Sequence, residues 1–390
     1  MSPQVIISLG MLPIFYASLT VYKGFDNNHL LWLYSFGAFI LFLSSYARTK
    51  NEKRFDININ TLRLDKLVKL NFALMLLFSV FMYQIYDGIP LIDSIVSDRT
   101  LSEFEHREKN SCCFVLGIHL LLIYMAIFLI LAKIYSNFLN KKNNLEIVLF
   151  IFATMFFALM NGRRQSLIFL FFVLLIYILQ TGSINSFISH FFKIKISRKV
   201  ITMIVGLTIF LFSIIFTTYS SNRDSENISL DFSSNFSRTF SAYTWPVKNF
   251  KYMTYDQDLI IFKPDYFSKI WVNYLPYKLR AHLKNSDDEK EVELKKKNVP
   301  VPGASFGFLG GIYFTGGIIS VFFYCLLIGR LLRFFYLKSQ ENILFIFPYA
   351  LSGWSIFMMS FYNHFTTLNF FIAPLIIFYF VYHFITRARE

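Results

Sequence analysis

Two adjacent arginines lie between two apolar segments, where a charged side chain is costly. The stretch 159–167 reads LMNGRRQSL, so Arg163 and Arg164 follow an Asn-Gly pair and have no acidic neighbour in the sequence. A charge at the edge of a hydrocarbon layer must reach the surface, pair with an opposite charge or bind an anion. The placement predicts that Arg163 and Arg164 belong to an anion-binding functional site.

The elements that position this pair are expected to be membrane-spanning helices. Of the 390 residues, 55% are hydrophobic and 16% are charged, and several apolar runs approach the ~20 residues that a helix needs to cross a bilayer. The sequence therefore predicts an all-α polytopic membrane protein with about ten transmembrane helices. The expected spans are residues 4–22, 29–47, 67–86, 114–136, 145–160, 165–180, 199–219, 304–329, 341–361 and 367–386.

The basic residues between these spans predict the orientation of the chain. Short loops on one side of the expected helices carry 19 Lys and Arg, whereas those on the other side carry six. Because Lys and Arg are enriched in cytoplasmic loops, both termini are expected in the cytoplasm, and Arg163 and Arg164 face outward. One miscounted span would reverse this orientation and make the pair an ordinary cytoplasmic anchor. The net charge of +14 then reflects the Lys and Arg residues in loops on one side of the membrane, and it does not indicate nucleic-acid binding.

The turn that carries the arginines is expected to be recessed. Residues 145–180 must make two crossings, and as helices these 36 residues cover about 54 Å, against ~60 Å for two full crossings. We therefore expect the guanidinium groups to start a few ångströms inside the hydrocarbon boundary, with Gly162 in the tight turn.

The spans are expected to form one integral membrane domain with one large outer loop. Transmembrane helices 1 to 7 occupy residues 1–219, the loop occupies residues 220–303, and helices 8 to 10 occupy residues 304–390. The loop is rich in Tyr, Trp, Lys and Asp rather than in Gly and Ser, which predicts that it is folded. Within it, residues 230–255 suit a helix that lies along the membrane interface.

A glycine-rich stretch follows this loop. Residues 301–317 read VPGASFGFLGGIYFTGG, and Gly303, Gly307 and Gly311 share one helix face. Small residues at this spacing allow close packing of helices. A nucleotide-binding loop is excluded, because no strand precedes the glycines and no Lys-Ser or Lys-Thr follows them.

Both motifs resemble those of a known family. The Asn-Gly-Arg-Arg turn at 161–164, and a Pro-Gly that ends a large outer loop before Phe-Gly-x-x-Gly at 306–310, are similar to bacterial O-antigen and oligosaccharide-repeat polymerases of the Wzy type. The resemblance covers about residues 160–175 and 300–330, and the topology agrees with it. The outer loops depart from the family pattern, because they lack a repeated Arg followed at a fixed distance by Gly.

The resemblance implies a GT-C type glycosyltransferase of the bacterial cytoplasmic (inner) membrane, with its site toward the outer leaflet. Such a polymerase transfers the growing glycan from undecaprenyl pyrophosphate to a sugar hydroxyl of the next lipid-linked repeat unit. Arg163 and Arg164, with Gln165 beside them, would bind the pyrophosphate and stabilise it as it leaves. The implied partners are the lipid-linked oligosaccharide, the lipid bilayer and a regulator of chain length, and no nucleic acid.

Other candidate site residues lie in the outer loops. Arg223 and Arg238 could contact pyrophosphate or glycan, although snorkelling at the interface explains them equally well. His364, in the outer turn SFYNHFT, is a candidate general base for the acceptor hydroxyl because its titration range suits proton transfer, and a structural role is the alternative. The other candidate bases are Asp224, Glu226 and His282.

No cofactor or metal is expected, because Cys112, Cys113 and Cys325 have no metal-ligand spacing. His119 lies within a span and is expected to bond a neighbouring helix. Two other functions stay open: a ligase that passes finished glycan to a lipid core, and a flippase or transporter of lipid-linked oligosaccharide. The absence of an internal sequence repeat and the single large outer loop favour an enzyme over a transporter.

Overall fold

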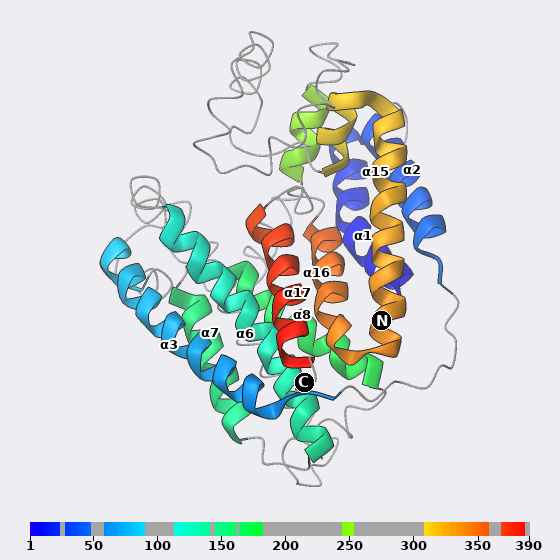
Figure 1. Cartoon of the computed structure of the whole chain (residues 1–390). Coiled ribbons are helices and arrows are strands. Elements are labelled where there is room, and N and C mark those ends of the chain that lie inside the picture. Colours follow the sequence, from blue (N-terminus) through cyan, green and yellow to red (C-terminus); the bar gives the residue numbers. More distant parts are fainter. Residues whose placement is uncertain are drawn as a thin grey trace, which may run out of the picture. The chain divides into compact units, whose positions relative to one another are not determined.

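The structure is a computed structural model that describes residues 1–23, 28–47, 58–89, 113–140, 145–160, 164–181, 244–252, 308–358 and 368–386 (Figure 1). These residues are almost entirely helical and contain no β-strand. The chain divides into two compact units. Unit 1 comprises Met1–Asn51, Thr239–Lys338 and Leu351–Ile372, and unit 2 comprises Glu52–Arg238, Ser339–Ala350 and Ala373–Glu390.

The described helices have the composition of a membrane protein. Four of them contain a segment long and apolar enough to cross a bilayer: Pro3–Tyr22, Thr61–Tyr86, Val115–Asn137 and Gly317–Glu341. Five shorter apolar helices accompany these segments in the described residues. The all-α class is therefore confirmed, whereas the count of ten spans and their orientation stay predictions. The expected span 199–219 lies outside the described residues.

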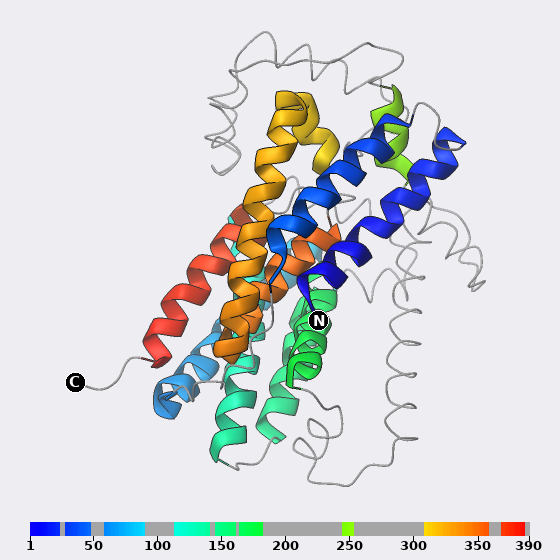
Figure 2. The ribbon, with the colours of Figure 1, turned by 90° about the vertical axis from the view of Figure 1, so that its right-hand side faces the viewer.

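In unit 1, α1 (Pro3–Tyr22) and α2 (His29–Ser45) form a hairpin whose two helices lie side by side (Figure 2). Asn28 caps α2 by accepting a hydrogen bond from the backbone N–H of Leu31, at 3.0 Å. The same side chain accepts from the hydroxyl of Ser18 and donates to the Ser18 carbonyl. Both residues are buried, so this polar pair fixes the two helices at the turn.

Close contacts between the helices of unit 1 occur at glycines. A Cβ atom at Gly10 of α1 would lie 2.9 Å from the backbone oxygen of Ile356 in α16 (Ile346–Phe357). A Cβ atom at Gly37 or at Gly329 would overlap Leu309 or Ser44, which join α2 to α15 (Phe308–Glu341). At Gly311, no atom of the described residues lies within 4 Å of a Cβ atom built there, so the described part of the chain shows no close packing at this glycine. Gly303 and Gly307 lie outside the described residues.

The helix α15 is longer than the expected span at its C-terminal end. It begins at Phe308 and continues to Glu341, twelve residues beyond the predicted end at 329, because Arg330, Arg333 and Lys338 are helical. Near its start, Gly317 has a φ of 65°, which only glycine adopts at little cost. The first part of α15 runs in a different direction from the rest (Figure 2). The short helix at 244–252 packs near this start, since the rings of Phe250 and Tyr313 lie 6.2 Å apart.

Unit 2 is built around α6 (Cys113–Asn140), which packs against α3 (Thr61–Tyr86), α7 (Leu145–Met160), α8 (Arg164–Thr181) and α17 (Ala373–Thr386). Aromatic rings fill the contacts: Phe128 of α6 lies 5.6 Å from Phe347 and 5.1 Å from Phe378. In the most apolar 18-residue segment of α6, 72% of the residues are buried, whereas in that of α3 22% are buried. The helix α6 is therefore the core of unit 2, and α3 presents much of its apolar surface outward.

One end of unit 2 is fixed by polar contacts between α3 and α17. The helix α3 begins six residues before the predicted span, at an N-cap where Asn60 accepts from the backbone N–H of Arg63, at 3.1 Å. The Asn60 N–H and the Arg63 guanidinium donate to the carbonyls of Ile385 and Phe384 in the last turn of α17. A cation beside the terminal carbonyls stabilises the C-terminus of a helix.

Candidate functional site

The arginine pair lies at the junction of α7 and α8. The helix α7 ends at Met160, and α8 begins at Arg164. The limits of α7 match the predicted span 145–160, and α8 is longer than the predicted span 165–180 by one residue at each end. Arg164 is therefore the first residue of an 18-residue apolar helix, where the free backbone N–H groups and the helix dipole add positive potential. Asn161, Gly162 and Arg163 lie outside the described residues.

Two polar side chains in the first turn of α8 are buried without hydrogen bonds to described residues. Ser166 is fully buried, and its hydroxyl has no hydrogen-bond partner. The side-chain oxygen of the partly buried Gln165 also has none. A buried polar atom without a partner costs about 1–3 kcal/mol. Such atoms also occur elsewhere in the described residues, for example the amide nitrogen of Gln4 and the amide oxygen of Asn71. The sequence indicated Gln165 but gave no signal for Ser166.

The other predicted site residues cannot be placed beside Arg164. His364, Arg223 and Arg238 lie outside the described residues, as do the alternative bases Asp224, Glu226 and His282. Their roles therefore stay predictions from the sequence.

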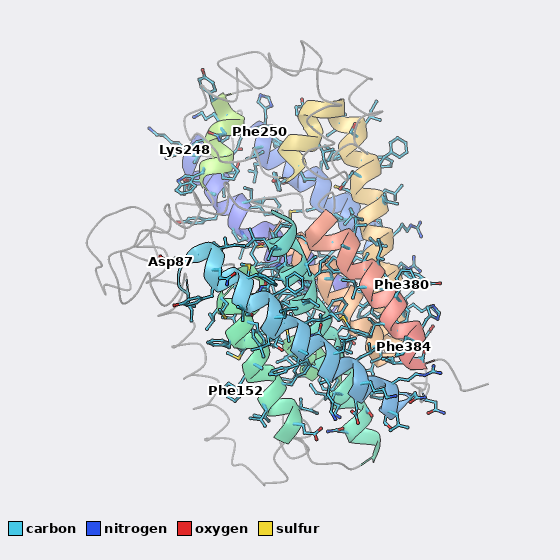
Figure 3. The ribbon with its side chains drawn as sticks, turned by 60° about the vertical axis from the view of Figure 1, so that its left-hand side comes forward. Asp87, Phe152, Lys248, Phe250, Phe380 and Phe384 are labelled. Atoms are coloured by element: carbon cyan, nitrogen blue, oxygen red, sulfur yellow. The ribbon has the colours of Figure 1, made fainter. Side chains whose placement is uncertain are left out.

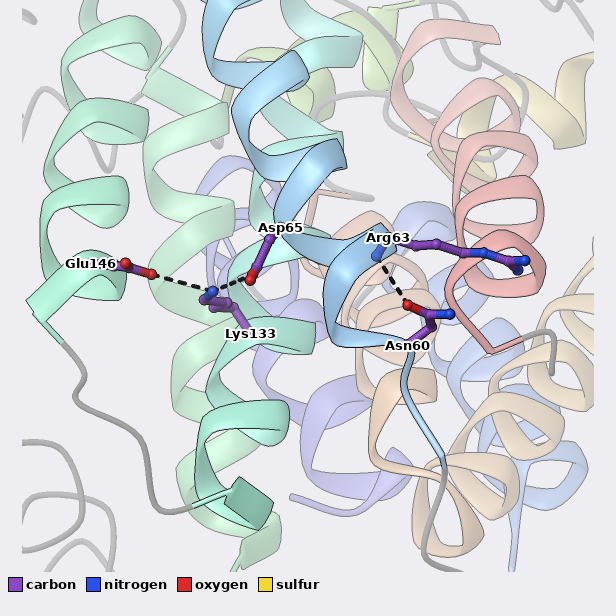
Figure 4. Close-up of polar contacts among 5 residues, drawn as sticks. All are labelled: Asn60, Arg63, Asp65, Lys133 and Glu146. Atoms are coloured by element: carbon purple, nitrogen blue, oxygen red, sulfur yellow. Dashed lines mark hydrogen bonds and ion pairs between the residues drawn. The ribbon is translucent and has the colours of Figure 1, made fainter. Parts of the chain in front are cut away.

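The opposite end of α7 carries an ionic cluster, shown in Figure 4. The ammonium of Lys133 in α6 binds the carboxylate of Asp65 in α3 and lies 3.3 Å from the carboxylate of Glu146 in α7. The Lys133 side chain is 10% exposed, against 38% for Asp65 and 80% for Glu146. One nearly buried cation therefore joins three helices of unit 2.

Sequence reasoning missed this cluster. The positive-inside rule counts Lys133 among the 19 basic residues of the expected cytoplasmic side, and it assigns no role to Asp65 or Glu146. A signal was present, because Lys133 interrupts the apolar run FLILAKIYS at 128–136 and a buried ammonium requires a carboxylate partner. The sequence alone did not identify which carboxylates provide it.

Between these two ends, polar side chains join α3 to α6. His119, fully buried, lies 3.1 Å from the hydroxyl of Ser79 through its Nε2 atom. The amide of Asn71 donates to the carbonyl of Leu122 at 3.3 Å. The prediction that His119 bonds a neighbouring helix is confirmed, and its role is that of an interhelical contact.

In unit 1, the short helix at 244–252 lies inside the predicted interfacial segment 230–255. Its Lys251 ammonium donates to the carbonyl of Val21 at 3.4 Å and lies 5.0 Å from the centre of the Tyr22 ring. The ammonium therefore caps the C-terminal end of α1. Lys248 is exposed, whereas Phe250 is buried, and the two point to different sides of the short helix (Figure 3).

Among the described residues, no group of three or more His, Cys, Asp or Glu could hold a metal ion. The described polar groups of unit 2 can serve three purposes. Those at the start of α8 can bind an anion, those at the far end of α7 pair opposite charges, and those between the two ends join α3 to α6.

No family model matches the chain, and no curated protein or solved structure is significantly similar to it.

Proposed function

We propose that this protein is an integral-membrane glycosyltransferase that polymerises lipid-linked oligosaccharide repeat units into a surface polysaccharide. Its donor is a glycan on undecaprenyl pyrophosphate, and its acceptor is a sugar hydroxyl of the next lipid-linked repeat. The new glycosidic bond forms as the bond to the pyrophosphate breaks, and a general base takes the proton of the hydroxyl. The membrane that fits this substrate is the bacterial cytoplasmic membrane.

The position of Arg164 as the first residue of α8 carries the proposal. A departing pyrophosphate gains negative charge, and a guanidinium beside a helix N-terminus is suited to stabilise that charge. The hydroxyl of Ser166 and the side-chain oxygen of Gln165, which have no hydrogen-bond partner among the described residues, lie in the same turn. A hydroxyl can donate to a phosphate oxygen, whereas an amide oxygen requires a donor such as a sugar hydroxyl. A glycosyl pyrophosphate offers both kinds of group.

The ionic cluster could favour a transporter, since charges within a membrane often mark ion pathways. Asp65 and Glu146 are, however, the fifth residue of α3 and the second residue of α7, so the cluster lies near helix ends rather than at their centres. Transporter sites lie near the middle of the bilayer. The cluster therefore suits a structural role, and the enzyme remains the better proposal.

The direct test is reconstitution of the purified protein with lipid-linked repeat units. The polymerase yields a ladder of products longer than one repeat, whereas absence of any such product would refute it. Added lipid core as an acceptor tests the ligase alternative, because only a ligase transfers glycan to it. In a deletion strain, surface glycan should shorten to single repeats, and complete loss of glycan would instead indicate a flippase or a ligase.

The role of the arginines is tested by replacing both with lysine in the same assay. Lysine retains the charge but loses the paired N–H groups, so R163K/R164K should lower the polymerisation rate about 10²–10³-fold. R330K/R333K is the matched control, because it makes the same change at two arginines of α15. Equal rates in both variants would contradict a specific pyrophosphate contact.

A further inference from the structure

The end of α1 carries a group of lysines and aromatic residues that the proposed function does not use. Lys23 is the residue after α1 and has a left-handed backbone conformation, with a φ of 57°. Lys251 from the short helix at 244–252 binds the carbonyl of Val21 two residues earlier. Lys248 lies one helical turn before Lys251, and both Lys23 and Lys248 are exposed. Lys23 and Lys251 therefore lie at the C-terminal end of α1, and Lys248 belongs to the short helix that packs there.

This end of α1 is expected to lie at a membrane surface. The helix has 20 apolar-rich residues, which span about 30 Å, the thickness of the hydrocarbon core. Its last residue, Tyr22, stacks under Lys251. Trp245 and Tyr252 of the short helix are partly exposed. Tyr and Trp gather where hydrocarbon meets headgroups, so the short helix is held at headgroup depth.

The short helix has the pattern of an interfacial element. Val247 and Phe250 are buried against unit 1, whereas Lys248 between them is exposed. The Lys251 ammonium donates to the Val21 carbonyl at the end of α1, so this cation already has a partner. Lys23 and Lys248 remain as exposed cations beside aromatic side chains, which is the arrangement of surfaces that bind anionic lipid.

We propose that Lys23 and Lys248 form a binding surface for the phosphate headgroup of an anionic phospholipid at the C-terminal end of α1. Lysine ammonium groups are point charges that bind a single phosphate without fixed geometry, whereas a pyrophosphate calls for the paired N–H groups of arginine. The two kinds of cation therefore separate two tasks: lysines in unit 1 contact the bulk lipid, and arginines in unit 2 contact the substrate. This inference does not depend on the polymerase activity.

Trp245 provides a reporter within the proposed surface. In a W32F/W271F variant of the full chain, Trp245 remains with Trp354, which is 3% exposed and contributes a constant background. The variant is reconstituted in vesicles of brominated phosphatidylglycerol or brominated phosphatidylcholine, and quenching of tryptophan fluorescence is measured across mixtures of each with the unbrominated lipids. We expect phosphatidylglycerol to quench at a lower mole fraction than phosphatidylcholine.

In the same background, K23Q/K248Q should reduce this preference about fivefold for each lysine removed, whereas K23R/K248R should retain it. The matched control K66Q/K69Q removes two exposed lysines of α3 in unit 2 and should leave the quenching unchanged. Equal quenching by the two lipids, or an unchanged preference in K23Q/K248Q, would overturn the proposal. Displacement of phosphatidylglycerol by a small mole fraction of undecaprenyl phosphate would also overturn it, since the surface would then select the isoprenyl lipid.

Discussion

The two ends of α7 differ in how unit 2 treats its polar groups. At the paired end, Lys133 joins Asp65 and Glu146, and Asn60 and Arg63 bind backbone groups of α3 and α17. At the arginine end, about 24 Å away along the 16 residues of α7, Gln165 and Ser166 have buried atoms without described partners. Satisfied polar groups stabilise a fold, whereas an unsatisfied group costs stability and is free to bind a ligand. The paired end is thus the structural end, and the arginine end is the candidate site.

The largest effect should come from breaking the paired end at its centre. Asp65→Leu removes the less exposed carboxylate and leaves the nearly buried Lys133 ammonium with only the exposed Glu146 in the cluster, so the free energy of unfolding should fall by about 2–4 kcal/mol. Denaturant titration in detergent micelles measures this change. The double variant D65L/K133M should recover part of the loss, because the ammonium that lost its Asp65 partner is then absent. A loss below about 0.5 kcal/mol in D65L would show that the cluster is not structural.

A smaller loss is expected for the polar contact between the two ends. Ser79→Ala removes the hydrogen bond between its hydroxyl and the Nε2 atom of His119, and contacts of this kind in membrane helices contribute about 0.5–1.5 kcal/mol. The same titration measures it, with Ser355→Ala as a control, because the Ser355 hydroxyl donates to the Leu351 carbonyl within its own helix. Equal losses in both variants would remove the distinction between an interhelical and a local contact.

At the arginine end, the sign of the effect should reverse. Ser166→Ala deletes a buried hydroxyl without a described partner, so stability should be unchanged or rise by up to about 1 kcal/mol. Comparison with Ser79→Ala in the same titration tests this directly, since both changes remove one hydroxyl from a buried serine. A loss in Ser166→Ala as large as that in Ser79→Ala would mean that the hydroxyl is already satisfied, and the contrast between the ends would disappear.

The smallest effect is expected at the exposed edge of the cluster. Glu146→Gln removes a carboxylate that is 80% exposed and 3.3 Å from Lys133, so the cost should stay below about 0.5 kcal/mol. Unfolding measured at low and at high salt isolates the contribution of the Glu146–Lys133 pair, because salt screens the attraction between an exposed carboxylate and its cation. A cost comparable to that of D65L would show that Glu146 is as important a partner of the lysine as Asp65.

The limits of α7 and α8 could be read from the sequence, whereas those of α3 and α15 could not. In the sequence, Asn161 and Gly162 stand between two apolar runs, so hydropathy and turn-forming residue types indicate the same boundary. The helix α3 begins in a charged turn that precedes its apolar run, and α15 continues beyond its apolar run through Arg330 and Arg333. Hydropathy marks the part of a helix that faces hydrocarbon, and the backbone hydrogen bonds continue as long as the side chains beyond it find partners or water.

The candidate site was only partly predictable for a related reason. A turn followed by Arg164 and an apolar run is a local pattern, so the sequence indicated the start of α8. The partners of Lys133 are 68 and 13 residues away, at Asp65 and Glu146, and only the packing of α3, α6 and α7 brings them together. A lone cation in an apolar run predicts that a partner exists but does not name it.

The composition of unit 1 has a consequence for how the protein is made. Gly10 and Gly37 of the α1–α2 hairpin contact Ile356 and Leu309, which the ribosome adds more than 250 residues after the hairpin. At about 5–20 residues per second, the hairpin waits on the order of 10–60 s for these partners. The Ser18–Asn28 bonds, made within ten residues of sequence, can hold the two helices together during that interval. Nascent chains that lack α15 would therefore expose the glycine faces to lipid, which makes this hairpin the place where an insertion factor or a quality-control protease would first meet an incomplete protein.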